Sequence, residues 1–286
     1  MQTRRIGDLA VGAIGLGGMP MSIEGRPSEE RSVATIHAAL DAGVTLIDTA
    51  DSYHRDANDV GHNESLIARA LASYGGDTSG VLVATKGGHL RPGDGSWTQN
   101  GDPAYLKRAC EASIKRLGVE AIGLYQFHRP DPRVPYVDSV GALRELLDEG
   151  KIVRAGLSNT NPEQIRQARE ILGEDLVSVQ NQFSPSFRSS EPELYLCNEL
   201  GLAFLPWSPL GGITNAPGLG DRFAVYAQIG AAHGVSPQQV CLAWMQAKAP
   251  VVVPIPGSSR PETIRDSVAA GSLELSTEEL SRLDAA

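Results

Sequence analysis

The chain contains four polar residues whose types and spacing suit proton transfer: Asp48, Tyr53, Lys86 and His128. Three of them end the short apolar runs VTLID, VLVATK and IGLYQFH. A run of this kind predicts a buried strand, so its last, polar residue is expected at the rim of a sheet or barrel. A phenol can donate a proton, and an ammonium beside it can lower its pKa. A carboxylate can hold that ammonium in place, and an imidazole can hydrogen-bond a carbonyl.

Each of these residues also has an ordinary structural explanation. Asp48 could cap a helix, Lys86 could be a solvated surface charge, and Tyr53 could be a loop aromatic. His128 could be a hydrogen-bonded core histidine. Their joint occurrence at successive strand ends favours a catalytic site over four separate structural roles.

Apolar runs alternate with helical segments along the chain. The helical segments carry an apolar stripe at i, i+3 and i+4 and end near a glycine, as in PAYLKRACEASIKRLG. Strict alternation predicts parallel strands joined by crossover helices, and about eight such units close into an α/β fold of the (β/α)8 type, a TIM barrel. The predicted strands cover 13–17, 44–48, 81–85, 122–127, 152–157, 177–180, 202–206 and 251–254.

Composition and length agree with one such barrel. Of the 286 residues, 41% are hydrophobic and 21% are charged, which predicts one globular domain over residues 1–286. The net charge of −9 argues against nucleic acid or an anionic membrane as a partner. MQTRR followed by AVGAIGLGG lacks the apolar core and cleavage site of a secretory leader, and no run is long enough to span a membrane. Three cysteines in separate predicted helices, Cys110, Cys197 and Cys241, are expected to be buried thiols in a reducing compartment. A cytoplasmic monomer is therefore expected.

These residues and their surroundings resemble the aldo-keto reductase family, whose Asp, Tyr, Lys and His tetrad has this order and similar intervals. The resemblance implies a small hairpin at residues 1–12 that closes the barrel bottom. It also implies NADPH-dependent reduction of an aldehyde or ketone, with Tyr53 as the general acid and His128 orienting the carbonyl. It covers nearly the whole chain through GLGGM (15–19), DTADSY (48–53), ATKGG (84–88), KRLG (115–118), QFHRPDP (126–132), GLSN (156–159), VQNQFSP (179–185), WSPLGG (207–212) and PIPGSS (254–259).

The same resemblance implies a binding site for NADPH or NADP+ across the barrel mouth. Gly18 and Met19 would lie near the nicotinamide, and Ser158, Asn159 and Gln180 would hydrogen-bond its carboxamide. The Trp207 ring would stack on the face of the nicotinamide. Tryptophan replaces the tyrosine most often found there, although either offers a flat apolar surface. The implied cofactor residues are Gly18, Met19, Ser158, Asn159, Gln180, Trp207, Ser208 and Leu210.

The segment 254–267 is expected to run from the last strand into a helix beginning near Pro261. A helix N-terminus is a natural phosphate site, so Gly257, Ser258, Ser259 and Arg260 are predicted to hold the cofactor phosphate. The segment departs from the family pattern, because Gly257 replaces a common lysine. Arg260 and Arg265 therefore remain as cations for the 2′-phosphate of NADPH, unless both are solvated surface charges.

The loops 87–101 and 208–220 are long and rich in glycine and proline, and both follow predicted strands. Such loops lie on the catalytic face of a barrel, so they are expected to build the binding pocket, unless they are tolerated insertions. His54 and Trp97 are predicted to contact a small-molecule carbonyl substrate. The chain lacks a longer C-terminal loop that narrows the pocket in some relatives, so an open pocket is expected.

Three other functions compete with this interpretation. A metal hydrolase could use His54, His62, His89 and His128, but the first predicted strand offers no ligand, and no metal is expected. GLGG resembles the start of a dinucleotide-binding glycine motif, but Pro20 stands at the third glycine position. Some proteins of this fold are regulatory subunits of channels. The tetrad is intact here, and the long N-terminal extension that such a role would suggest is not seen.

Overall fold

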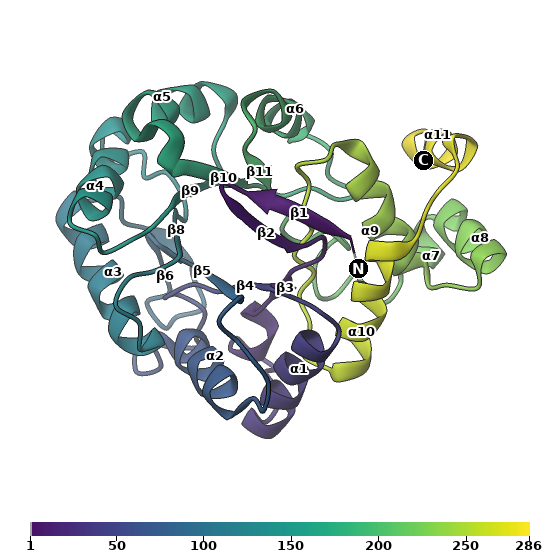
Figure 1. Cartoon of the computed structure of the whole chain (residues 1–286), viewed down its shortest axis with the longest axis horizontal. Coiled ribbons are helices and arrows are strands. Elements are labelled where there is room, and N and C mark those ends of the chain that lie inside the picture. Colours follow the sequence, from purple (N-terminus) through teal and green to yellow (C-terminus); the bar gives the residue numbers. More distant parts are fainter. Residues whose placement is uncertain (1) are drawn as a thin grey trace.

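A curved parallel sheet forms the centre of the structure, a computed structural model that describes residues 2–286. Helices surround the sheet, and each strand leads into a helix that returns to the next strand (Figure 1). The predicted (β/α)8 barrel is thereby confirmed, although most of the regular strands are shorter than predicted. In their order across the sheet, the strands are β11 (Ala203–Phe204), β10 (Leu176–Gln180), β9 (Ala155–Ser158), β8 (Leu124–Phe127), β5 (Leu82–Gly87), β4 (Leu46–Asp48) and β3 (Leu16–Gly17).

Five of the described helices begin at a residue whose side chain accepts a hydrogen bond from a free N–H of the first turn. Asp102, for example, accepts a hydrogen bond from the Tyr105 N–H, and Gly118 ends the same helix with a φ of 68°. No helix within the described part of the chain is long and apolar enough to cross a membrane. The helices are α1 (Glu29–Asp41), α2 (His62–Ser73), α3 (Pro103–Leu117), α4 (Tyr136–Asp148), α5 (Pro162–Leu172), α6 (Glu191–Leu200), α7 (Leu219–Arg222), α8 (Ala224–His233), α9 (Pro237–Lys248), α10 (Pro261–Ala269) and α11 (Thr277–Asp284).

The eighth predicted strand, 251–254, is not a regular strand. The segment still closes the barrel between β11 and β3, with a parallel bridge from Phe204 to Val252. N–H groups on the β3 side donate to the carbonyls of Pro254 and Pro256 at 2.9 and 3.0 Å. Proline has no N–H to donate in return, so the ladder is interrupted here while the barrel stays closed.

An N-terminal hairpin covers the end of the barrel where the strands begin (Figure 1). It consists of the antiparallel strands β1 (Thr3–Ile6) and β2 (Leu9–Gly12), as the family resemblance implied. Ile6 and Val11 of the hairpin pack against interior side chains near the starts of the barrel strands, namely Leu46, Leu82, Leu124, Val177 and Ala203. This end of the barrel interior is therefore a packed apolar layer.

The interior changes from apolar to polar along the strands. In β5, side chains alternate, so Leu82 and Lys86 point to the same side of the sheet, and Lys86 lies in register with Gln126 of β8. A Cβ added to Gly156 of β9 would lie 2.8 Å from Gln126 Cγ and 2.4 Å from Ser178 Oγ. The glycine thus leaves room for a polar layer at the ends of the strands.

Candidate active site

Lys86 lies in this polar layer and is completely buried. Its ammonium donates to Asp48 Oδ2 at 2.8 Å, to the Thr49 carbonyl at 2.8 Å and to the Tyr53 hydroxyl at 3.2 Å. All three of its protons therefore have acceptors, which excludes a solvated surface charge. Burial favours the neutral amine, but the Coulombic attraction of Asp48 and Tyr53 outweighs it and raises the pKa of Lys86. The side chain is therefore an ammonium at neutral pH.

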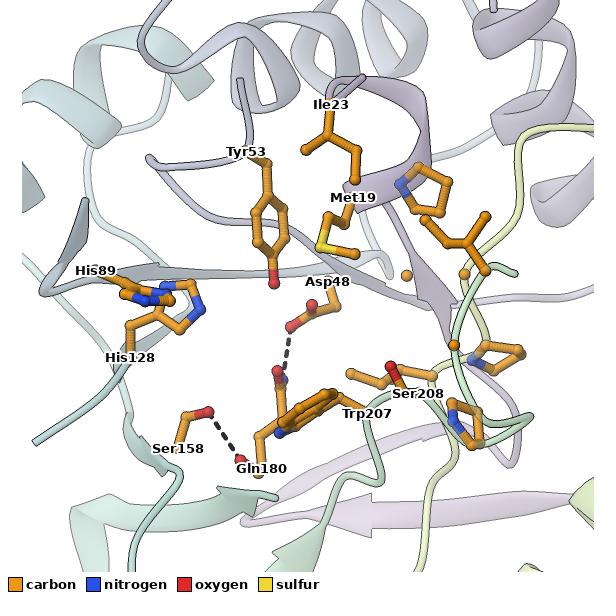
Figure 2. A pocket seen from close by; sticks show the side chains of 18 of the residues that line it. Met19, Ile23, Asp48, Tyr53, His89, His128, Ser158, Gln180, Trp207 and Ser208 are labelled. Carbon is orange, nitrogen blue, oxygen red and sulfur yellow. Dashed lines mark hydrogen bonds between the residues drawn. The ribbon is translucent and has the colours of Figure 1, made fainter. Parts of the chain in front are cut away.

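Asp48, the last residue of β4, is held from two sides. The Gln180 amide donates to Oδ1 at 2.7 Å (Figure 2). Lys86 binds Oδ2, and the Gln126 amide approaches Oδ1 at 3.4 Å. The carboxylate has an exposed fraction of only 3%. Its hydrogen bonds go to side chains of the barrel interior, so it orients Lys86 and does not cap a helix.

Tyr53 lies in the loop after β4, with its hydroxyl directed into a cavity (Figure 2). Burial raises the pKa of this phenol above its ordinary value, and the nearby Lys86 ammonium acts in the opposite direction without cancelling the effect. Lys86 does lower the pKa of Tyr53, as predicted, but burial raises this pKa by more. The phenol is therefore protonated at neutral pH, as a proton donor must be.

His128 follows β8 and faces Tyr53 across the cavity, with ring centroids 5.8 Å apart. Burial, together with repulsion from Lys86, His89 and Arg129, holds the pKa of His128 well below its ordinary value. The imidazole is therefore neutral. A neutral imidazole can donate one N–H to a carbonyl oxygen without adding charge to the site.

The cavity beside Tyr53 and His128 has a volume of about 600 Å³. Its wall contains about two thirds of the site residues predicted from the sequence. Two of these, Asn159 and Ser208, have positive φ values of 57° and 49°, which are uncommon outside glycine and cluster at functional sites. The predicted residues in the wall are Met19, Asp48, Tyr53, Trp97, His128, Ser158, Asn159, Gln180, Trp207, Ser208, Leu210 and Gly257.

Besides the buried Lys86, two more predicted residues lie behind the wall of this cavity. The Gly18 N–H donates to the Asp48 carbonyl at 2.8 Å, and a Cβ at Gly18 would lie 2.5 Å from Asn63 Oδ1, so the residue packs against the back of the site. The His54 side chain is buried, and its carbonyl accepts a hydrogen bond from Arg91. His54 is therefore outside the cavity wall as the structure defines it, and its contact with substrate stays a prediction.

The predicted phosphate residues lie at the N-terminus of α10, outside the cavity wall apart from Gly257. The buried Ser258 donates from Oγ to the Arg260 carbonyl at 3.0 Å, while Ser259 is half-buried. Arg260 is 52% exposed and lies 3.8 Å from Glu262, and Arg265 is exposed on the same helix. Both arginine side chains can therefore move to an incoming anion.

The loop 87–101 forms one side of the cavity. It contains an antiparallel hairpin, β6 (His89–Leu90) and β7 (Thr98–Gln99). The Trp97 ring lies 4.8 Å from His89, and the Arg91 guanidinium stacks 4.6 Å from the Trp97 centroid. Arg91 also pairs with Glu24 at 2.5 Å, which ties the hairpin to the loop after β3. This loop is therefore an ordered part of the site.

The four histidines of the metal alternative do not form a ligand cluster within residues 2–286. His62 begins α2, where its Nδ1 lies 2.7 Å from Ser22 Oγ, whereas His89 packs between Trp97 and His128. Among residues 2–286, no group of three or more His, Cys, Asp and Glu side chains is placed to hold a metal ion.

Several residues of the site were not predicted. The Thr49 carbonyl is a backbone group, for which a side-chain pattern gives no signal. Gln126 lies in an apolar run, where alternation along the strand could have placed it in the barrel interior. Arg129 lines the cavity directly after His128, and its position at a strand end was the available signal.

A second buried carboxyl lies near the tetrad. Asp51 is 5% exposed, its Oδ1 has no hydrogen-bond partner within the described residues, and Tyr105 reaches Oδ2 at 3.4 Å. Burial, with some repulsion from Glu64, raises the pKa of Asp51 to about 8. The carboxyl is therefore mostly protonated in the folded protein at neutral pH.

We expect Asp51→Asn to become increasingly more stable than the wild type as pH rises. The folded pKa lies above the unfolded value, so the protonated carboxyl contributes stability that is complete below about pH 4 and is lost as pH rises through about 8. Asparagine cannot ionise, so the difference should grow by up to about 1.4 kcal/mol per pH unit between these limits. Urea unfolding at pH 5, 6, 7 and 8 measures it, with the exposed carboxyl variant Asp138→Asn as the control. A pH-independent difference would contradict the assignment.

Comparisons with known proteins agree with this geometry. Residues 13–286 match the model of the aldo/keto reductase family. An uncharacterised oxidoreductase of Schizosaccharomyces pombe is 34% identical over 287 aligned residues, which cover 99% of this chain and 89% of that protein. The structure of an aldo/keto reductase from Klebsiella pneumoniae, in complex with NADP and acetate, has a TM-score of 0.82 and 29% identity and covers 99% of this chain and 94% of that one. A glycerol dehydrogenase from Gluconobacter oxydans has a TM-score of 0.84 and 26% identity over the same shares.

Proposed function

Because the chain belongs to the aldo/keto reductase family, we propose that it is an NADPH-dependent oxidoreductase that reduces an aldehyde or ketone to an alcohol. The observation that carries this proposal is the joint placement of Tyr53, Lys86 and Asp48 beside His128 at one cavity. An accessory protein that only binds the cofactor would not need a buried ammonium held against a phenol, because such a pair is costly to bury.

In the proposed reaction, the substrate carbonyl oxygen accepts hydrogen bonds from the Tyr53 hydroxyl and the His128 imidazole. The reduced nicotinamide supplies the hydride when the cofactor is bound. As negative charge develops on the carbonyl oxygen, Tyr53 donates its proton to it. The resulting phenolate is stabilised by the Lys86 ammonium, which lies 3.2 Å from the Tyr53 hydroxyl oxygen in the structure. Asp48 keeps Lys86 in position throughout.

The residues around Trp207 fit a nicotinamide group. The buried indole Nε1 has no hydrogen-bond partner among residues 2–286, and the ring lines the cavity opposite Tyr53 (Figure 2). The Asn159 and Gln180 amide groups donate from nitrogen to His128 and Asp48, so their oxygens remain available as acceptors. The Ser158 hydroxyl donates to the Gln180 carbonyl and can still accept. These acceptors suit the N–H groups of a carboxamide.

We expect Arg260→Ala to lower kcat/KM for NADPH about tenfold, because a charge-assisted hydrogen bond to the 2′-phosphate is lost. The value for NADH, which lacks that phosphate, should change little. Steady-state kinetics with both cofactors measure the effect, and Arg265→Ala compares the other cationic candidate. Equal use of both cofactors by the wild type would contradict the proposed preference.

The function itself is tested by following carbonyl-dependent oxidation of NADPH with a panel of sugar, steroid and aromatic carbonyls. Turnover with any of these supports the reductase. Cofactor binding measured by calorimetry without turnover would favour the accessory role instead. No cofactor binding would contradict both.

The proposal also includes the form in which the protein acts. We propose one domain over residues 1–286, acting as a monomer in the cytoplasm. The three cysteines support a reducing compartment, because Cys110, Cys197 and Cys241 are all buried free thiols.

A further inference from the structure

Arg129 is one of the residues that line the active-site cavity. The residue directly follows His128 at the end of β8 and is partly buried. Burial lowers the pKa of Arg129, and no carboxylate among residues 2–286 opposes this effect or comes within the 4.0 Å of an ion pair. An arginine stays charged in this setting, so the cavity contains a cation whose counter-ion is not supplied by the described chain.

The other charges of the wall do not neutralise it. Asp48 is the only carboxylate in the wall, and Lys86 pairs with it at 2.8 Å from behind. The two imidazoles are neutral, because burial lowers the pKa of His89 to about 4 and holds the pKa of His128 well below its ordinary value. The cavity thus has a net charge of about +1 from Arg129 in a chain whose net charge is −9. The cavity therefore favours an anionic ligand, although the chain as a whole is negatively charged.

The position of Arg129 points to the substrate. It repels positive charge on both His128 and His89, so it acts electrostatically on the two rings that face each other at the substrate side of the cavity. Trp97 and Gln99 of the hairpin complete this side. The serines and Arg260 of the predicted phosphate site lie elsewhere, at the start of α10.

We propose that Arg129 binds a carboxylate group of the substrate, so that the cavity selects carbonyl compounds that also carry a carboxylate. This inference rests on the proposed reductase function. The guanidinium fork matches a carboxylate in geometry, and both gain from pairing where water is partly excluded. The carbonyl lies against Tyr53 and His128, and the carboxylate lies against Arg129.

The test compares 4-formylbenzoate with its methyl ester, which have the same formyl group and ring but differ in charge. We expect the wild type to favour the acid by about 10- to 100-fold in kcat/KM, mainly through KM. Arg129→Met should remove this preference by lowering kcat/KM for the acid much more than for the ester. Arg129→Lys should retain part of it, because the charge remains but the fork is lost. Arg166→Met, at an exposed position on α5, controls for the change in net charge.

Other outcomes separate this inference from the proposed function. Equal use of acid and ester by the wild type would overturn the role of Arg129 and leave the reductase intact. Equal losses with both substrates in Arg129→Met, with weaker NADPH binding, would assign the arginine to the cofactor and also overturn the inference. If the wild type reduces neither compound, calorimetry with 4-formylbenzoate decides. Binding that Arg129→Met abolishes supports the carboxylate site, and absence of binding overturns it.

Discussion

Tyr53→Phe should lower kcat by about 10²- to 10⁴-fold, the usual contribution of a general acid. The substitution removes one hydroxyl that faces the cavity and lies 3.2 Å from the Lys86 ammonium, and it retains the ring. Without the hydroxyl, the developing alkoxide loses the proton donor at the cavity wall, because the neutral His128 is a weaker acid than a phenol and the Lys86 ammonium lies behind the wall. Single-turnover and steady-state kinetics with a reactive aldehyde measure the loss.

Cofactor affinity should change little in Tyr53→Phe, because the phenol is not among the residues that fit the cofactor. Calorimetry with NADPH checks this point. Tyr195→Phe, which removes the hydroxyl of an exposed tyrosine on α6, is the matched control and should retain wild-type kcat. Near-normal turnover in Tyr53→Phe would show that another group donates the proton.

Lys86→Met should lower both stability and activity. The substitution leaves the Asp48 carboxylate buried without its cationic partner, and breaking a buried pair in this way costs about 3–5 kcal/mol. Turnover should fall at the same time, because the Tyr53 phenolate loses the ammonium that stabilises it. Urea unfolding and kcat measure the two effects.

A double variant separates these two effects. Asp48→Asn/Lys86→Met removes both charges, so most of the lost stability should return while turnover stays low. Activity restored together with stability would mean that Lys86 acts only through folding. Stability as low as in Lys86→Met would instead show that the cost arises from packing and not from the uncompensated carboxylate.

The sequence predicts the barrel well because apolar runs and helical stripes alternate with little interruption. The prediction fails in detail where backbone chemistry matters more than hydrophobicity. Segment 251–254 is as apolar as a strand, yet Pro254 and Pro256 cannot donate to a ladder, so only a bridge forms there. The hydrophobic pattern of the sequence therefore shows where a strand lies, whereas backbone hydrogen bonding decides whether that strand is regular.

The candidate site is predicted to a similar extent. Lys86 and His128 end strands, and strand ends of a barrel meet at one face, so their proximity follows from topology. The pKa of Tyr53 does not follow from topology, because burial raises it and the Lys86 charge lowers it. The balance between these two effects depends on packing in three dimensions. The same holds for His54, which follows Tyr53 directly but turns its side chain into the protein instead of the cavity.

The β6–β7 hairpin joins the active site without joining the barrel ladder. Its strands pair with each other, and Arg91 fastens it to neighbouring loops through side-chain contacts. Substitutions and length changes in the hairpin, residues 89–99, can therefore accumulate over evolutionary time while the strands that hold Asp48 and Lys86 keep their register. After a gene duplication, changes in this hairpin can alter substrate recognition while the residues that transfer the proton are retained.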